Sequence, residues 1–500
     1  MNISRTVIPK NPAEFPDEID ILILGGGMSG LELAKHLNNR EVENIVIIEA
    51  GPADDFNHIN SGEEFQRADE YWKNEELDKY AYRSWQSLSE PHYSKGTCLR
   101  RRVGGRSLYW HGVILPIEAE ALKYWPAKIV SDLTEKWLDG PSLYTQVQSD
   151  ILAWAEKSYD TDFSFKFANF EFKITPQATR IIGDSGRWEA YSPLSYWKQD
   201  QDNKVRTNPL IIPRHEAVSL IITDGKCIGA KLRDMASNEI RDVLANKCVL
   251  ALGTIENSRL ATQALYDLGI LIEKKITGLV DHIVQGFNVT IEHDKVSDKI
   301  NKLIESHPDA LFFSPSLCGD RFNIFFTINK SNFGIELEAW TMGEQIPSTH
   351  TNVTTNAGAI PLSISCDLGY ADNTLIKKEK HELNMFWHEV CNNTKIPFKP
   401  LDFQAGFIIH ARTMGDVHNH IRSSSRIVNY NVPITWISPL GTENHEGSTL
   451  PLGEILNENH EFNKINNLFA IGPSTFPRPG AANPSLTTLA LSRRLAHILN

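Results

Sequence analysis

Three glycines near the N-terminus, Gly25, Gly27 and Gly30, are spaced as G-x-G-x-x-G. An apolar run at residues 19–24 precedes them and a helical pattern of apolar residues follows at residues 31–37, so the motif lies where a buried strand turns into a helix. Such a turn offers free N–H groups and the positive end of a helix dipole to a pyrophosphate. We expect Gly25 to allow the turn, Gly27 to admit the pyrophosphate, and Gly30 to let the helix pack on the strand.

A second apolar run, at residues 44–48, ends at Glu49. A carboxylate at this place in the pattern accepts hydrogen bonds from the ribose hydroxyls of a dinucleotide. Strand, glycine turn, helix and terminal acid together predict a dinucleotide-binding site. The pattern serves NAD and FAD alike, and these residues leave the choice between the two open.

Two further stretches have residue types that suit a phosphate or flavin site. A Gly-Gly pair at residues 104–105, followed by Ser107, predicts a second tight turn that a ligand can approach. Near the C-terminus an apolar run at residues 468–471 predicts a strand. Asn483 and Pro484 predict the N-cap and the first position of a final helix. The N-terminus of that helix would face whatever lies beside Asn483.

These blocks, in this order along the chain, resemble the glucose-methanol-choline (GMC) oxidoreductases, which are FAD enzymes that oxidise alcohols. The resemblance covers residues 1–120 and 441–500, and a block at residues 245–260 and the Leu-x-Asp-His element at residues 279–282 also match it. It implies FAD rather than NAD. The cofactor contacts that it implies are Gly25, Gly27, Met28, Ser29, Gly30, Glu49, Arg102, Gly104, Gly105, Ser107, Val218, Gly472, Ser474, Pro484 and Ser485.

The same resemblance implies an α/β fold, in which a doubly wound, Rossmann-like FAD-binding domain carries an inserted α+β substrate domain with an antiparallel sheet. The FAD-binding domain is expected to be discontinuous and to comprise residues 15–124, 206–284 and 431–500. The substrate-binding domain is expected to comprise residues 125–205 and 285–430, which match no motif.

Oxidation of an alcohol needs a base for the hydroxyl proton, and histidine suits that task at neutral pH. The chain has 17 histidines, so composition does not select one. The resemblance implies that His445 is the base and that Asn483 positions the substrate oxygen, while the last helix stabilises negative charge on the reduced flavin. His418 and His420 resemble a metal pair but lack a third ligand at metal-binding spacing, so we expect no metal.

Two positions depart from the family pattern. Arg106 stands where the family has small residues, and we expect its charge to lie beside the pyrophosphate. The pattern V-G-G-x-S-x-x-W at residues 103–110 is closest to the pyranose oxidase-like branch, in which a histidine just before the tryptophan binds FAD covalently. Tyr109 stands at that place, so we expect non-covalent FAD.

The expected reaction oxidises a hydroxyl group of a polar small molecule, such as a sugar or amino sugar, by hydride transfer to flavin N5, with O2 or another carrier as acceptor. A choline-type alcohol, a lyase that uses FAD structurally, and an inactive FAD-binding protein are alternatives. Glu443 and Glu446 flank His445, with no Lys or Arg between residues 427 and 463. If this loop lines the pocket, its negative field favours a substrate with an amine.

Composition argues against several other classes. The net charge is −12 and no basic run is present, which disfavours nucleic acid and anionic membrane surfaces as partners. The N-terminus lacks an apolar signal region, and no apolar run approaches the roughly 20 residues of a membrane span. Six scattered cysteines without C-x-x-C predict reduced thiols rather than a metal site or a disulfide framework. We therefore expect a soluble, cytoplasmic enzyme.

Overall fold

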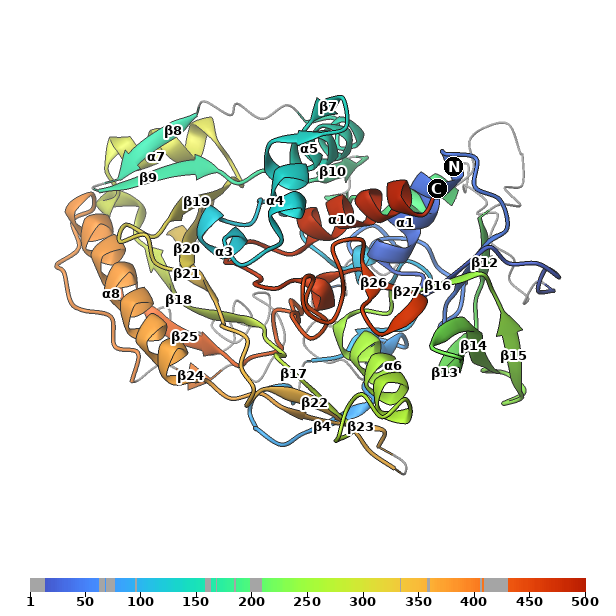
Figure 1. Ribbon diagram of the computed structural model, residues 1–500. Helices are drawn as coiled ribbons and strands as arrows, with labels where there is room; N and C mark the ends of the chain where they lie inside the picture. The colour runs from blue at the N-terminus through green and yellow to red at the C-terminus, as the bar shows by residue number, and fades with distance from the viewer. Residues whose placement is uncertain are drawn as a thin grey trace.

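The computed structural model of the 500-residue chain has a mixed α/β fold with two large sheets (Figure 1). It describes residues 14–62, 68, 77–94, 97–157, 163–167, 169–183, 186–197, 209–332, 334–357, 360–404, 407–408 and 430–500. The histidines of the rejected metal pair, His418 and His420, lie outside the described residues.

The first sheet has nine strands in the order β12-β2-β1-β16-β27-β14-β13, with β15 beside β14 and β26 beside β27. Neighbours from β12 to β14 pair in parallel, which agrees with their short, branched and mostly buried sequences. The three predicted strands are therefore present as β1, β2 and β27. The bounds are β1 Ile21–Leu24, β2 Ile45–Ile48, β12 Leu210–Ile212, β13 His215–Thr223, β14 Lys226–Asp234, β15 Ile240–Leu244, β16 Lys247–Leu250, β26 Glu461–Phe462 and β27 Ile465–Ala470.

Helices cover the first sheet, and its strand β1 contributes to two hydrophobic clusters. Side chains alternate along a strand, so Ile21 and Ile23 of β1 join the cluster that contains Leu31 of α1, whereas Leu22 joins the cluster that contains Leu260 of α6. Helix α10 packs on both α1 and α5 (Figure 1). The bounds are α1 Met28–Asn38, α5 Leu143–Trp154, α6 Thr254–Asp267 and α10 Ser485–Ile498.

The second sheet has eight strands in the order β24-β25-β18-β21-β20-β19-β9-β8 and is antiparallel except for the pair β24 and β25. Helix α8 lies along it (Figure 1). Strands β18 and β25 belong to this sheet although they begin within segments expected in the cofactor domain. The bounds are β8 Ser164–Phe167, β9 Phe170–Ile174, β18 His282–Ile291, β19 Leu311–Pro315, β20 Phe322–Ser331, β21 Gly334–Glu344, α8 Tyr370–Asn392, β24 Phe407–Ile408 and β25 Ile434–Ser438.

Smaller elements fill the space around the two sheets. A four-stranded sheet has the order β17-β22-β23-β4, and three pairs, β3 with β5, β6 with β7 and β10 with β11, are separate. Their bounds are β3 Ala81–Tyr82, β4 Trp85–Ser87, β5 Leu99–Arg100, β6 Lys136–Trp137, β7 Gly140–Pro141, β10 Thr179–Ile182, β11 Arg187–Ala190, β17 Lys275–Thr277, β22 Asn352–Thr355 and β23 Leu362–Ser365. The short helices include η3 Gly105–Leu108, α3 Ala119–Leu122, α4 Ala127–Thr134, η4 Pro193–Trp197, η5 His293–Lys295, α7 Asp298–Ser306 and η6 Pro473–Thr475.

The six cysteines are free thiols, and Cys318 is the exposed one. Among the described residues, none of the helices has the length and apolar character needed to cross a membrane.

Candidate active site

The three glycines of the first motif form the turn between β1 and α1. Gly25 has a φ of +113°, and a Cβ atom there would lie 2.3 Å from the carbonyl oxygen of Ala251. A Cβ on Gly30 would lie 2.1 Å from the carbonyl oxygen of Gly25, so only a residue without a side chain allows this helix to approach the strand. A Cβ on Gly27 would meet no described atom within 4 Å. The backbone of Gly27 therefore borders open space at the N-terminus of α1.

Glu49 follows β2, and its carboxylate ties the glycine turn to the end of that strand. Its Oε2 accepts a hydrogen bond from the N–H of Gly26 at 3.0 Å, and its Oε1 accepts one from the N–H of Gly51 at 2.8 Å. Burial raises the pKa of Glu49 to about 7, against the opposite effect of these two donors. The acid is thus already held at the position that the motif predicts.

The second glycine pair lies directly against the first turn. The N–H of Gly104 donates to the carbonyl oxygen of Gly26 at 2.8 Å, and Gly104 has a φ of +98°. A Cβ on Gly105 would lie 3.3 Å from Cα of Gly27. The fold therefore places both glycine turns on one side of the open space beside Gly27.

The residues that follow β27, near the C-terminal end of the chain, also lie against the first turn of α1. A Cβ on Gly472, whose φ is +96°, would lie 3.0 Å from Oγ of Ser29, which follows Met28 in the first turn of α1. Oγ of Ser474 accepts a hydrogen bond from Nδ2 of Asn257 at 3.0 Å. Asn257 lies on α6 and also binds the backbone just after β16, so it links the ends of two parallel strands. Asn257 is thus a further residue of this site, beyond those expected from the sequence.

Other expected cofactor contacts have partners within the protein. Ser107 donates to the backbone of its own loop at 2.6 Å and lies 2.6 Å from Oγ of Ser192. Arg102 donates to the carbonyl oxygen of Asp55 at 2.6 Å and to the hydroxyl of Tyr109 at 3.3 Å. Burial raises the pKa of the Tyr109 hydroxyl well above its ordinary value. The Tyr109 hydroxyl is therefore protonated and neutral, and it contacts the guanidinium of Arg102.

Val218 lies on β13, at an edge of the first sheet, where the register with β14 shifts. Its carbonyl oxygen accepts a hydrogen bond from the guanidinium of Arg259 at 3.0 Å. Its expected contact with the adenine side of the cofactor remains a prediction.

Arg106 binds an acid from a distant loop, and the expected place of its charge beside the pyrophosphate stays a prediction. Its guanidinium forms a two-point ion pair with Glu446, with N–O distances of 2.5 and 2.8 Å. Glu446 is 3% exposed. The expected negative field from the two acids beside the candidate base is therefore wrong for Glu446, because a cation from a distant loop neutralises it. Glu443 is half-buried, and burial raises its pKa to about 7.

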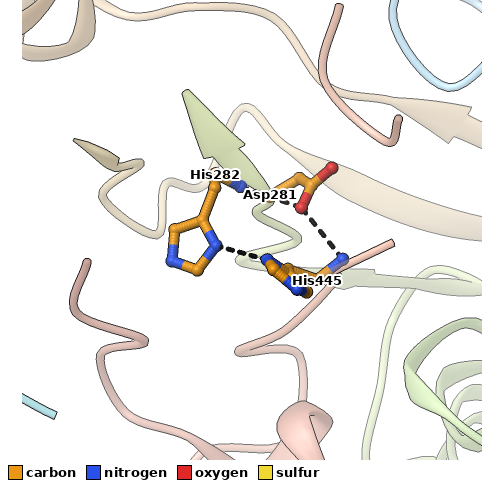
Figure 2. A group of neighbouring side chains, drawn as sticks. All are labelled: Asp281, His282 and His445. Carbon is orange, nitrogen blue, oxygen red and sulfur yellow. Dashed lines mark hydrogen bonds between the residues drawn. The ribbon is translucent and has the colours of Figure 1, made fainter. Parts of the chain in front are cut away.

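Asp281 organises the loop that carries the candidate base. Its Oδ2 accepts a hydrogen bond from the N–H of Gly441 at 2.6 Å, and its Oδ1 accepts from the N–H groups of His282 and His445 at 2.8 and 3.1 Å. Figure 2 shows the carboxylate beside the two histidines. Burial raises the pKa of Asp281 well above its ordinary value, and the negative charges of Glu446 and Glu443 add to this effect.

The two histidines contact each other through their rings. Nδ1 of His282 lies 2.8 Å from Nδ1 of His445, and the rings are nearly perpendicular (Figure 2). Nε2 of His282 lies 3.0 Å from the carbonyl oxygen of Gly480. Burial lowers the pKa of His282 to about 4 and that of His445 well below its ordinary value, with further lowering of the latter by His282 and Arg106. Both rings are neutral at neutral pH.

Asn483 meets the outer nitrogen of His445. Nδ2 of Asn483 lies 3.5 Å from Nε2 of His445, and Oδ1 of Asn483 is buried without a hydrogen-bond partner among the described residues. The expectation that Asn483 is the N-cap is wrong, because α10 begins at Ser485 after Pro484 and has no side-chain cap. The amide turns to the histidine instead, which leaves it available to a ligand at the N-terminus of α10.

Asp281, His282 and His445 also satisfy the simple geometric condition for a three-ligand metal site. The two Nδ1 atoms, however, are 2.8 Å apart, which is a hydrogen-bond distance. Ligand nitrogens at about 2.0–2.1 Å from a tetrahedral zinc would stand further apart than this. The three N–H groups around Asp281 already occupy its carboxylate, so the geometry favours a hydrogen-bonded group.

The fold of the chain is similar to the folds of solved oxidoreductases. Three solved structures illustrate it. Pyridoxine 4-oxidase from Mesorbium loti has a TM-score of 0.61 and 14% identity, over 96% of this chain and 99% of that one. A variant of formate oxidase from Aspergillus oryzae has a TM-score of 0.61 and 13% identity, over 97% and 99%. An FAD-dependent oxidoreductase from Chaetomium thermophilum has a TM-score of 0.58 and 14% identity, over 96% and 99%.

At these identities the likeness shows the fold. No protein-family model matches the sequence, and no curated protein matches it either. The predicted mixed α/β fold is thereby confirmed, and the doubly wound arrangement of an FAD-binding domain stays a prediction.

Proposed function

We propose that this protein is an FAD-dependent oxidoreductase that oxidises a hydroxyl group of a polar small molecule to the carbonyl. The nine-stranded sheet would be the doubly wound FAD-binding domain, formed by residues 15–124, 206–284 and 431–500. The eight-stranded sheet would form the core of the substrate domain, which comprises residues 125–205 and 285–430, and β25 and the start of β18 would extend this sheet from the FAD-binding segments. The observation that carries the proposal is the meeting of His445 with Asn483 at the N-terminus of α10, 38 residues apart in the sequence.

The described residues fit the cofactor. The open space in front of Gly27 adjoins the unpaired N–H groups at the start of α1, which suit a pyrophosphate. Glu49 stands at the end of β2, where its carboxylate is within reach of a ribose. Near the candidate base, Oδ1 of Asn483 and Oγ of Ser448 are buried without partners among the described residues, as expected of groups that face a polar ligand.

FAD, when bound, supplies the acceptor for the hydride from the carbinol carbon. The protein supplies the acid–base chemistry and the positioning. His445 is neutral, so its Nε2 is suited to take the proton of the substrate hydroxyl. Asn483 has a donor beside that nitrogen and a free acceptor, so it can hold the substrate oxygen next to the base. The N-terminus of α10 adds a positive dipole end to the same place.

The substrate is proposed to be a polar alcohol of the sugar type, and the structure weakens the argument for a required amine. Arg106 neutralises Glu446, so Glu443 is the remaining acid of this loop that could attract a cation. With a pKa of about 7, Glu443 carries only part of a charge at neutral pH. A choline-type alcohol stays an alternative, and the acceptor of the electrons is proposed to be O2 or another carrier.

The test is to purify the protein, measure its flavin content, and screen alcohols anaerobically for bleaching of the flavin absorbance. The proposal expects a yellow protein whose absorbance near the flavin maximum disappears with at least one neutral polyol or sugar. A yellow protein that no alcohol bleaches but that cleaves a hydroxyl-bearing substrate would identify the lyase alternative. A protein that binds no flavin at all would overturn the proposal.

A further inference from the structure

The position of the proton on His445 follows from a chain of hydrogen bonds that begins at the backbone. The carbonyl oxygen of Gly480 can only accept, so Nε2 of His282 must donate to it across 3.0 Å. A neutral imidazole carries one N–H, so Nδ1 of His282 has a lone pair. The 2.8 Å contact between the two Nδ1 atoms then requires His445 to donate from its Nδ1. Nε2 of His445 is left with its lone pair, opposite the NH₂ group of Asn483.

The backbone at Gly480 is itself held in place. Its N–H donates to Oε1 of Glu344 at 3.2 Å, and Glu344 is paired with the guanidinium of Arg478. The next N–H, of Ala481, donates to Oε2 of Glu118 at 2.9 Å. The two carboxylates therefore hold the backbone at residues 480–481 in place. The carbonyl of Gly480 has little freedom to turn away from the ring.

We propose that His282 is a positioning residue that fixes His445 in the tautomer with the proton on Nδ1 and the lone pair on Nε2. This inference rests on the proposed function of His445 as the base. His282 does not touch the substrate. It supplies the acceptor for the Nδ1 proton, keeps the ring of His445 in one orientation, and remains hydrogen-bonded to the imidazolium that forms when Nε2 takes a proton.

The arrangement differs from the usual carboxylate partner of a catalytic histidine. Asp281 lies in the same cluster but binds the backbone N–H of His445 and not its ring. A neutral acceptor stabilises the imidazolium less than a carboxylate would, so the base keeps a low proton affinity. The charged and titratable groups around the two rings are Asp281, Glu443, Glu446 and Arg106, with Glu118, Glu344 and Arg478 beyond Gly480.

The first test reads the tautomer directly. Two-bond ¹H–¹⁵N correlation spectra of the protein labelled with ¹⁵N in its histidine rings distinguish the two neutral forms, and His445→Asn assigns the signal. We expect an Nδ1–H form for His445 and an Nε2–H form for His282, at neutral pH and without substrate. An Nε2–H form for His445 in the unsubstituted protein would overturn the proposal, whatever the variants do.

A matched pair of substitutions tests the positioning role. In His282→Asn the short side chain can place an amide oxygen near the former Nδ1, so His445 keeps its acceptor. In His282→Gln the longer side chain reaches towards Gly480 and leaves His445 without one. We expect His282→Asn to keep the Nδ1–H form and to slow flavin reduction less than tenfold. We expect His282→Gln to lose that form and to slow flavin reduction by roughly 10²-fold or more, within the usual contribution of a general base.

The two variants also distinguish a positioning role of His282 from a purely structural role. Loss of a structural contact would affect flavin content and the thermal midpoint in both, whereas loss of the tautomer affects the reduction rate and its pH profile in His282→Gln. Equal rates and equal tautomers in the two variants would contradict the proposal. If the Nδ1–H form is present but no alcohol reduces the flavin, the proposed function fails and the positioning of His445 by His282 stands.

Discussion

Arg106 binds Glu446 through both of its terminal nitrogens, although 340 residues separate the two in the sequence. The pair joins the second glycine turn to the loop of His445. The guanidinium of Arg106 also donates hydrogen bonds to the carbonyl oxygens of Asn444 and Cys98. The pair thereby fixes the glycine turn against the loop of the candidate base, and Arg106 balances the charge of Glu446 within the protein.

Arg106→Gln should destabilise the protein strongly, because it leaves the carboxylate of Glu446 buried without its cation. Removal of one partner of a buried ion pair typically costs about 3–5 kcal/mol. The measurement is the free energy of unfolding in urea. The double variant Arg106→Gln/Glu446→Gln should recover part of the loss, and a double variant less stable than Arg106→Gln alone would show that the pair is not the cause.

His445→Ala should slow flavin reduction by roughly 10²–10⁴-fold while the flavin stays bound, because a general base contributes about that much. Anaerobic stopped-flow absorbance gives the rate, and the ratio of flavin to protein absorbance gives the occupancy. His350→Ala, at an exposed histidine, is the matched control. A His445→Ala protein that is reduced as fast as the parent would exclude His445 as the base.

Glu49→Ala should weaken the retention of FAD before it changes the chemistry. Hydrogen bonds to a charged group contribute about 1.5–3 kcal/mol, so the Kd for FAD should rise roughly 10- to 150-fold. Titration of the apoprotein with FAD, followed by flavin fluorescence, measures the change. Glu43→Ala removes an exposed acid just before β2 and should leave the Kd unchanged. Full occupancy of Glu49→Ala after prolonged dialysis would argue against a ribose contact.

The flavin should be released by acid, because Tyr109 stands where a related branch has the histidine that bonds to FAD. Tyr109 is also engaged with Arg102 and is held as a neutral phenol. Precipitation with trichloroacetic acid should leave a colourless pellet and a yellow supernatant. A yellow pellet that keeps its flavin absorbance after washing would show a covalent bond.

Any preference for an aminated substrate over its neutral counterpart should be small at low pH and should grow as the pH rises through about 7. Glu443 is protonated and neutral below its pKa of about 7, and it is anionic above it. The measurement is the ratio of kcat/KM for a matched substrate pair between pH 6 and pH 8 at low salt. Glu443→Gln should flatten the ratio, whereas Glu454→Gln, at an exposed acid, should not. A pH-independent ratio would remove Glu443 from the pocket.

The sequence predicts the local parts of this site well and the distant pairings poorly. The turn of Gly25, Gly27 and Gly30 is legible because strand, turn and helix follow one another within a few residues. The sequence indicates only that the charge of Arg106 lies at a glycine turn, because no local pattern reveals its contact with an acid from a loop 340 residues further on. His282 is part of the Leu-x-Asp-His element, but its contact with His445 spans 163 residues and depends on the pairing of β18 with β25, the strand before the loop of His445.

The role of the Asn483 side chain could not be predicted from its neighbours in the sequence. An asparagine before a proline is a typical helix start, yet the side chain has a second possible partner in His445. Helix ends vary by a residue or two in any case. Only the spatial neighbour decides whether the amide caps the helix or faces the site.

Strand β27 is the last strand of the first sheet to be synthesised, because it lies near the C-terminus of the chain. It pairs with β16, which pairs with β1, so the middle of the first sheet is closed by residues 465–470. At roughly 5–20 residues per second, the ribosome makes this strand about 20–90 s after β1. Until then β16 presents an unpaired edge, a template for association with other chains. Gly472 can therefore take its place beside Ser29 only after this last strand has inserted.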